Sequence, residues 1–243
     1  MRYLLILFTC ISFGQFNPIF WAQKTDANTF IGGVSGTITT GAQLATKLGI
    51  SSARVTNFKI VGSNIQAKIT GGTYVLPGSV FLSDTSITYY NDPTGLVTSL
   101  TTATFRSCTN LTSVYFPNCT TIDNVGSLSF YQTFALTSVY LPLVTTINTQ
   151  TFNQSALSTL NLPELTNVKG VNAFGAMNNI TLINMPKCTI LGSDTGNNNT
   201  FLNIKTGCVI NVNTVLQTAN AGAPDGDLVY ATGTRSATVN YIP

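Results

Sequence analysis

The stretch that decides the fold runs from Ile87 to Pro186 and repeats one phrase five times. The copies read Ile87-TYYND-Pro93, Leu111-TSVYF-Pro117, Leu136-TSVYL-Pro142, Leu157-STLNL-Pro163 and Ile180-TLINM-Pro186. In each copy an aliphatic residue is followed six positions later by proline, and the proline-to-proline steps are 24, 25, 21 and 23 residues. Self-similarity at a period of this length is the signature of a solenoid, in which each repeat forms one coil.

A phenylalanine recurs at a nearly constant distance before the later copies of the phrase. Four phenylalanines precede the aliphatic residue of the next copy by six, six, five and six positions: Phe105, Phe130, Phe152 and Phe174. A further one, Phe201, lies late, behind a polar run at residues 193–200 that we interpret as a surface loop. Two markers in register over this many copies predict that phenylalanine fills the convex side of each coil.

The phrase itself has the pattern of a short β-strand. In the second copy the apolar Val114 and Phe116 alternate with Ser113 and Tyr115, which is the period of a half-buried strand. The corresponding inward pairs in later copies are Val139 and Leu141, Leu160 and Leu162, and Ile183 and Met185. One such strand cannot bury its apolar face alone, so the coils are expected to stack about 4.8 Å apart around a continuous core.

Proline ends each strand because it lacks the N–H that a strand ladder needs. The segment after the proline, such as Thr-Thr-Ile122, Thr-Thr-Ile147 or Thr-Asn-Val168, then supplies one more buried aliphatic residue as the coil turns back.

The segments on either side of the repeats are predicted to be caps, because an open solenoid end would expose core residues. The N-terminal cap, residues 25–86, contains a predicted helix over 39–50 with a threonine N-cap, and strand-like stretches at 55–61, 65–69 and 73–76. In the C-terminal cap, residues 209–243, a final strand is expected at 209–213 and a tight turn at 223–227. Residues 87–208 are the repeats between these caps.

The second copy also carries a recognisable motif. Phe105-RS-Cys108-TN-Leu111-TS-Val114-Y-Phe116-Pro117 resembles the BspA-like leucine-rich repeats, whose copies read roughly F-x-x-C-x-x-L-x-x-V-x-[FL]-P. The likeness covers residues 87–208, and the tail at 216–231 looks like the ending of such proteins in Bacteroidetes and in their bacteriophages. The resemblance implies a non-enzymatic solenoid used for adhesion or recognition. The expected fold is mostly β, a leucine-rich-repeat solenoid of about five coils with an N-terminal α/β cap and a C-terminal β cap.

Composition argues against most enzymatic and nucleic-acid functions. The chain has no histidine, which excludes a histidine general base and the commonest zinc sites. Only 8% of its 243 residues are charged, the net charge is +3, and the basic residues are scattered, so no patch is expected to follow a phosphate backbone. We predict no catalytic residues, cofactor or metal. The one enzymatic alternative is a carboxylate pair such as Asp92 with Asp123, as in a glycosidase.

Two smaller motifs have alternative interpretations. Asp225-Gly226-Asp227 offers two carboxylates for a calcium ion, but calcium takes six to eight oxygen ligands, so a plain turn is favoured. Four cysteines follow the leader: Cys108, Cys119, Cys188 and Cys208. Because the equivalent Cys119 and Cys188 are three coils apart, about 14 Å, we predict buried free thiols rather than disulfides.

Residues 1–24 form a signal-like leader followed by an apolar segment. Residues 1–14 have a basic start and an apolar run that is too short for a membrane span. The apolar segment beyond them, which would favour association with other apolar surfaces, contains Phe16, Pro18, Phe20 and Trp21. This peptide either covers the open end of the solenoid or docks into a larger assembly.

The outward residue at the centre of each strand is predicted to form a row across the coils: Asn91, Tyr115, Tyr140, Asn161 and Asn184. The residue two positions earlier forms a second row, which begins at Tyr89. Tyrosine and asparagine in rows suit contact with a glycan or protein, so we take these six residues as candidate ligand-binding residues. The alternative is a solvated strand face that is stabilised by cross-strand stacking.

These features predict a recognition or structural module displayed outside the cell. The favoured hypothesis is a bacteriophage virion component, such as a head or tail fibre, that contacts other virion proteins. The alternative is a secreted bacterial surface adhesin that binds host-surface protein or glycan. Either form could be a homo-oligomer, and its location would be the virion or the extracellular cell surface.

Overall fold

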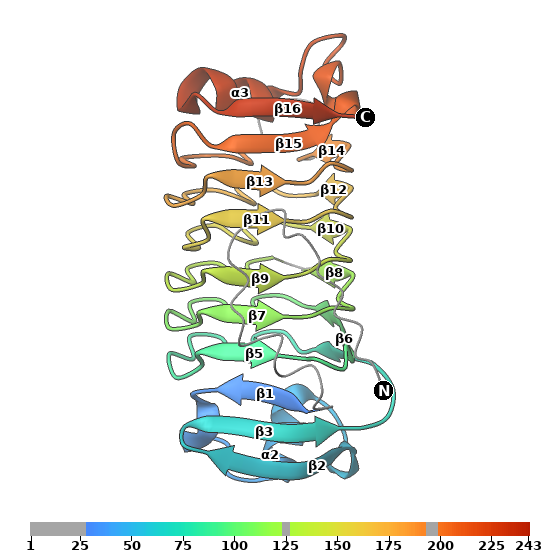
Figure 1. Ribbon diagram of the computed structural model, residues 1–243, viewed down its shortest axis with the longest axis vertical. Helices are drawn as coiled ribbons and strands as arrows, with labels where there is room; N and C mark the ends of the chain where they lie inside the picture. The colour runs from blue at the N-terminus through green and yellow to red at the C-terminus, as the bar shows by residue number, and fades with distance from the viewer. Residues whose placement is uncertain (1–27, 123–126, 193–198) are drawn as a thin grey trace, which may run out of the picture.

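The computed structural model describes residues 28–122, 127–192 and 199–243, which form a column of stacked coils above a small α/β cap (Figure 1). Each coil contributes one short strand to the front of the column. The five predicted strands are all present, and two more follow them: β5 (Tyr89–Asn91), β7 (Ser113–Tyr115), β9 (Ser138–Tyr140), β11 (Thr159–Asn161), β13 (Leu182–Asn184), β15 (Val209–Asn213) and β16 (Thr238–Ile242). Neighbouring front strands pair in parallel, except that β9 and β11 are not paired within the described residues.

A second row of strands forms where each coil turns back. Its members pair in parallel in chain order: β4 (Tyr74–Leu76), β6 (Val97–Leu100), β8 (Thr121–Ile122), β10 (Thr146–Ile147), β12 (Asn167–Val168) and β14 (Ile190–Leu191). The predicted aliphatic residues of the return segment, Ile122, Ile147 and Val168, are all fully buried. This row therefore closes the core opposite the front strands.

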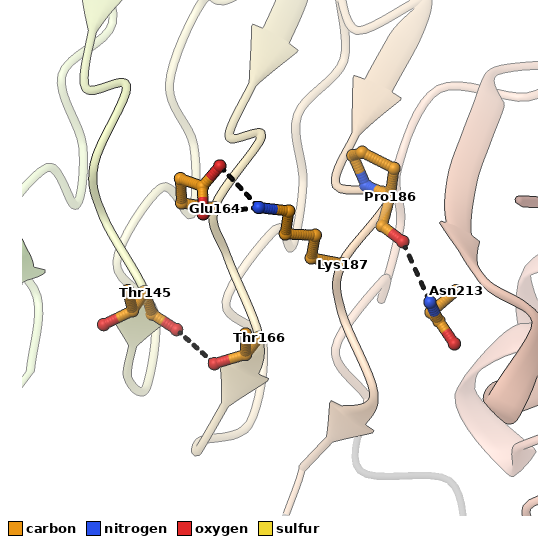
Figure 2. Close-up of polar contacts among 6 residues, drawn as sticks. All are labelled: Thr145, Glu164, Thr166, Pro186, Lys187 and Asn213. Carbon is orange, nitrogen blue, oxygen red and sulfur yellow. Dashed lines mark hydrogen bonds and ion pairs between the residues drawn. The ribbon is translucent and has the colours of Figure 1, made fainter. Parts of the chain in front are cut away.

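Hydroxyl groups tie the return segments together from coil to coil. The Thr166 Oγ1 donates to the Thr145 carbonyl over 3.1 Å, and Thr145 donates in the same way to Thr120 over 3.3 Å (Figure 2). On the same side, Lys187 of one coil forms an ion pair of 2.7 Å with Glu164 of the preceding coil. The Asn213 Nδ2 likewise donates to the Pro186 carbonyl. Adjacent coils are thus connected by hydrogen bonds and an ion pair between their return segments.

The phenylalanines form a continuous stack inside the column. The parallel rings lie 5.2, 5.6, 5.4, 6.3 and 5.6 Å apart, centroid to centroid, in the order Phe81, Phe105, Phe130, Phe152, Phe174 and Phe201. All six are fully buried, which confirms the second sequence marker and extends it to Phe81.

Residues with a positive backbone φ flank each of these rings, which the sequence did not indicate. The residues two positions before and two after the phenylalanine have positive φ, for example Gln150 (φ 55°) and Gln154 (φ 61°) on either side of Phe152. This conformation costs most side chains roughly 1 kcal/mol. It turns every second N–H toward the next coil, so that Gln150, Phe152 and Gln154 all donate to backbone carbonyls there.

The N-terminal cap closes the lower end of the column with an antiparallel sheet and a helix. Strands β2 (Val55–Val61), β3 (Asn64–Ile69) and β1 (Thr29–Gly32) pair in that order, and β1 pairs with β5, the first front strand. The predicted helix is α2 (Gly41–Leu48), capped reciprocally by Thr40 and Gln43 and ended by Gly49 at φ 67°. Short 3-10 turns, η1 (Val34–Gly36) and η2 (Ser52–Arg54), connect these elements.

The C-terminal cap differs from the prediction in a helix that replaces the expected turn and in an additional strand. The segment expected to be a tight turn at residues 223–227 begins a helix instead, α3 (Gly226–Arg235), whose N-cap is Asp225. A 3-10 turn, η3 (Thr214–Gln217), precedes α3, and the predicted strand β15 is followed by the unpredicted β16. The buried Asp227 accepts hydrogen bonds from the Thr200 N–H and Oγ1 at 3.0 and 2.8 Å.

The four thiols that lie in the described residues are free and buried, as predicted: Cys108, Cys119, Cys188 and Cys208. Burial raises the pKa of Cys119 and of Cys188 to about 12. Both side chains are close to their own coil's backbone, since each Sγ lies 3.4 Å from the carbonyl two residues later. They therefore act as small apolar fillers of the core.

Candidate functional site

The candidate site is the outer surface of the front strands, which we call the strand face. The register places Asn91, Tyr115 and Tyr140 side by side, and it aligns Asn161 with Asn184 in the upper sheet. These are the rows that the sequence predicts. The pairing also adds two members that the prediction missed, Asn211 of β15 and Asn240 of β16.

The lower part of the strand face is aromatic. The rings of Tyr115 and Tyr140 are stacked at 4.6 Å with an angle of 6° between their planes. Both residues remain partly accessible to solvent. Burial raises the pKa of Tyr115, and the proximity of Tyr140 and of Asp92 raises it further. The pair therefore presents a stacked aromatic surface to solvent.

The upper part of the strand face is a ladder of amides. The Asn184 Nδ2 donates to the Asn161 Oδ1 at 2.7 Å, Asn211 donates to Asn184 at 2.9 Å, and Asn240 donates to Asn211 at 2.9 Å. An amide has two N–H donors and two acceptor positions, and the ladder uses one of each in its interior members. The remaining donor and acceptor of each amide give the face a regular pattern of hydrogen-bonding groups.

Two members of the predicted rows lie out of reach of a ligand. Asn91 is only 2% exposed and Ser113 only 8%. Tyr89, by contrast, is half-buried, and burial raises its pKa. The accessible part of the strand face therefore runs from Tyr89 and Tyr115 up to Asn240.

The strand face carries no charged side chain on β5, β7, β9, β11, β13, β15 or β16. The nearest carboxyl group is that of Asp92, which is fully buried and accepts hydrogen bonds from the Val97 N–H at 2.7 Å and from the Thr94 hydroxyl. Asp92 thus holds the turn that follows β5. Asp123, its partner in the enzymatic alternative, lies outside the described residues, so that alternative is not tested.

The other acidic motif also has a role within the fold. The Asp225 carboxylate accepts from the Asp227 N–H at 2.9 Å and so caps α3, while the Asp227 carboxylate connects α3 to the coil of Thr200. Within the described ranges, no three His, Cys, Asp or Glu residues are grouped so that they could hold a metal ion.

The predicted docking segment, Phe16, Pro18, Phe20 and Trp21, lies outside the described residues, as does the leader before it. The assignment of these residues therefore stays a prediction. In the part of the chain that the structure does cover, no helix has both the length and the apolar character needed to cross a membrane.

The repeats have a direct counterpart among known protein families. The sequence model of the BspA type leucine-rich repeat region matches residues 76–204 in six copies. The chain belongs to this family. Six BspA-type copies are one more than the five phrases in the sequence, and the match begins in β4, the first strand of the return row. Repeats of this type are typical of non-enzymatic surface and recognition proteins.

Among solved structures there is also a similar protein. The crystal structure of a leucine-rich repeat protein from Bacteroides ovatus is similar to this BspA-type chain, with 18% sequence identity and a TM-score of 0.44. The match covers 63% of this chain and 39% of that protein, so the chain spans well under half of that relative's length. None of the curated proteins matches the sequence.

Proposed function

We propose that the chain is a non-enzymatic recognition module displayed outside the cell, and that the strand face is its binding surface. The observation that carries the proposal is the ordered, uncharged character of this face, which has the Tyr115–Tyr140 stack in one sheet and the ladder from Asn161 to Asn240 in the next. Side chains that already hold each other in place lose little conformational entropy when a partner binds.

The chemistry of the face favours a neutral partner, either a glycan or an uncharged patch of a host-surface protein. The tyrosine rings offer flat contact area and a polar hydroxyl at the edge. The amides of Asn184 and Asn211 offer one further donor and one further acceptor each, at the spacing of adjacent coils. A strongly charged partner would find no opposite charge on the strand face to offset its desolvation.

Binding to arrays of bacterial and host glycans, and to isolated cell-surface proteins, tests the proposal. We expect the double substitution Tyr115→Ala with Tyr140→Ala to weaken binding at least tenfold, which corresponds to about 1.4 kcal/mol. The matched pair Tyr115→Phe with Tyr140→Phe keeps the stacked rings and should retain most of the affinity. Ile190→Ala, at a 48% exposed apolar position of the return row, is the control. Unchanged binding by the ring-deleted variant would refute the assignment of this face.

For the biological setting we propose a bacteriophage virion component of the head- or tail-fibre type, with a secreted bacterial surface adhesin as the alternative. The proposal is supported by the apolar segment around Phe20 and Trp21, which suits insertion into a larger assembly. Mass spectrometry of the N-terminus on native material distinguishes the two. Retention of Met1 favours the virion component, and a start between Gln15 and Gln23 favours the adhesin. Particles that lack the chain yet assemble and attach normally would contradict the virion assignment.

A further inference from the structure

One of the turns that lead into the front strands is a residue shorter than its counterparts. The phenylalanine lies eight positions before the first residue of the following front strand in the coils of Phe105, Phe130 and Phe174, but only seven positions before it in the coil of Phe152. The missing residue falls between Phe152 and Thr159, in the turn that leads into β11. A shorter turn cannot extend as far from the column axis as the turns below and above it.

Two local features accompany the short turn. Strands β9 and β11 are the only consecutive front strands that do not pair within the described residues. Val139 of β9 is also only partly buried, whereas its equivalents Val114, Leu160 and Ile183 are at most 1% exposed. The column is therefore indented at the level of this coil.

The indentation forms a recess with a volume of about 330 Å³, at the turns that enter β9, β11 and β13. This volume lies at the lower end of the range of small-molecule sites. Its apolar lining consists of Phe134, Ala156 and Ala176. Phe134 is 55% exposed, an unusual position for a phenylalanine in a chain that buries six others in its core stack. Because the turn beside it is short, this ring is left without a covering neighbour.

The rest of the lining is polar and uncharged. Gln154, Asn178 and Asn179 contribute amide groups, and Ser155 contributes the fourth polar residue. The Ser155 side chain is only 4% exposed, and its Oγ has no hydrogen-bond partner in the described structure. A buried hydroxyl without a partner costs free energy, which a ligand hydroxyl or a bound water would recover.

We propose that this recess binds a neutral sugar, one or two residues long, such as the end of a glycan chain. An exposed aromatic ring packs against the C–H face of a pyranose, and amides that both donate and accept match its hydroxyl groups. The absence of charge from the lining disfavours anionic sugars, whose carboxylate would find no cation there. The site lies on the turns and not on the strand face, so it is a second site, independent of the function proposed above.

Saturation-transfer NMR on the full chain, with neutral hexoses and N-acetylhexosamines as probes, tests the proposal. We expect transfer to the ring C–H protons of at least one neutral sugar, and none to sialic acid or glucuronic acid. Phe134→Ala should weaken binding roughly tenfold, because it removes the aromatic contact. Ala156→Phe should abolish binding by filling the recess. Leu82→Ala, at a 44% exposed apolar position in the first coil, is the matched control and should bind normally.

Since Phe134 and Ala156 lie at the surface, both variants are expected to fold, and an unchanged melting temperature checks this. No transfer to any neutral sugar, or transfer that survives both Phe134→Ala and Ala156→Phe, would overturn the proposal. Stronger transfer to the anionic sugars would overturn it as well. The Tyr115→Ala, Tyr140→Ala variant separates the two sites, because it should lose only the binding that belongs to the strand face.

Discussion

Removal of the Phe152 ring should cost far more stability than removal of the Phe134 ring, although the two residues lie in adjacent coils. Phe152 is fully buried, with Phe130 stacked at 5.4 Å on one side and Phe174 at 6.3 Å on the other. Phe134 is more than half exposed. Substituting alanine at each position makes the same chemical change in two different environments.

The magnitude follows from how little the site can relax. The neighbouring Phe130 and Phe174 are held by backbone hydrogen bonds of 2.9 and 3.0 Å to the next coil, so their rings cannot move in to fill the space. Phenylalanine-to-alanine changes in cores cost about 3–5 kcal/mol, with the larger values where a cavity persists. We therefore expect about 4 kcal/mol for Phe152→Ala, and at most about 0.5 kcal/mol for Phe134→Ala. For a chain of this size the larger value lowers the melting temperature by roughly 8–16 °C.

Urea unfolding followed by far-UV circular dichroism, together with a thermal melt, measures both variants against the unsubstituted chain. Repeat proteins depend on contacts between adjacent coils, so Phe152→Ala should also make the transition less cooperative. A cost below about 1 kcal/mol for Phe152→Ala, or equal costs for the two variants, would show that the phenylalanine stack is not part of the core.

Three further predictions concern the core, the ladder and the thiols. Ile183→Asp should prevent folding because it buries an unpaired charge, whereas Val139→Asp, at the half-buried position of β9, should give soluble chain with a lower melting temperature. Asn184→Ala breaks two ladder hydrogen bonds and should cost about 1–2 kcal/mol in urea unfolding, with no change in the circular dichroism of the folded state. A thiol reagent at pH 8 should label Cys119 and Cys188 only after unfolding. Because burial raises their pKa from 9.0 to about 12, unfolded thiols lose protons first, so stability should fall as the pH rises above about 9.

The repeated phrase was enough to predict the column because each of its markers has one physical cause. The proline after each front strand ends a ladder that it cannot continue, and the alternation of Val114 with Tyr115 has a single arrangement that buries the valine. The helix α2 was equally readable, since Thr40 and Gly49 mark its two ends by capping and by a left-handed backbone. These signals are local and do not depend on distant parts of the chain.

The helix α3 was missed because its local signals favour a turn. Its first residue, Gly226, and the internal Gly233 are poor helix formers, and the preceding Pro224 and Asp225 are common turn residues. The helix is stabilised by tertiary contacts, namely burial of Leu228 and Ala231 and the hydrogen bonds of Asp227 to Thr200. Such contacts are formed only when the last coils are in place.

The asparagine ladder was predicted only in part for a related reason. Asn161 and Asn184 occupy equivalent positions of the phrase, so the sequence aligns them. Asn211 and Asn240 lie in strands without the full phrase, and they join the row because β15 pairs with β13 and β16 pairs with β15, both in register. The alternative interpretation, stabilisation by cross-strand contacts, also has support here, because the same hydrogen bonds that preorganise the face hold adjacent coils together.

The short spacing before β11 can be read from the sequence, but its structural effect is seen only in the stacked column. The step of 21 residues from Pro142 to Pro163 and the spacing of five residues from Phe152 to Leu157 are both legible in the sequence. Neither spacing alone distinguishes a harmless deletion from a site. In the stacked column this short turn coincides with the unpaired β9 and β11, with the exposed Phe134 and with amides from two other turns around that ring. A regular solenoid has no such recess, so the departure from regularity is where a specific small ligand is best accommodated.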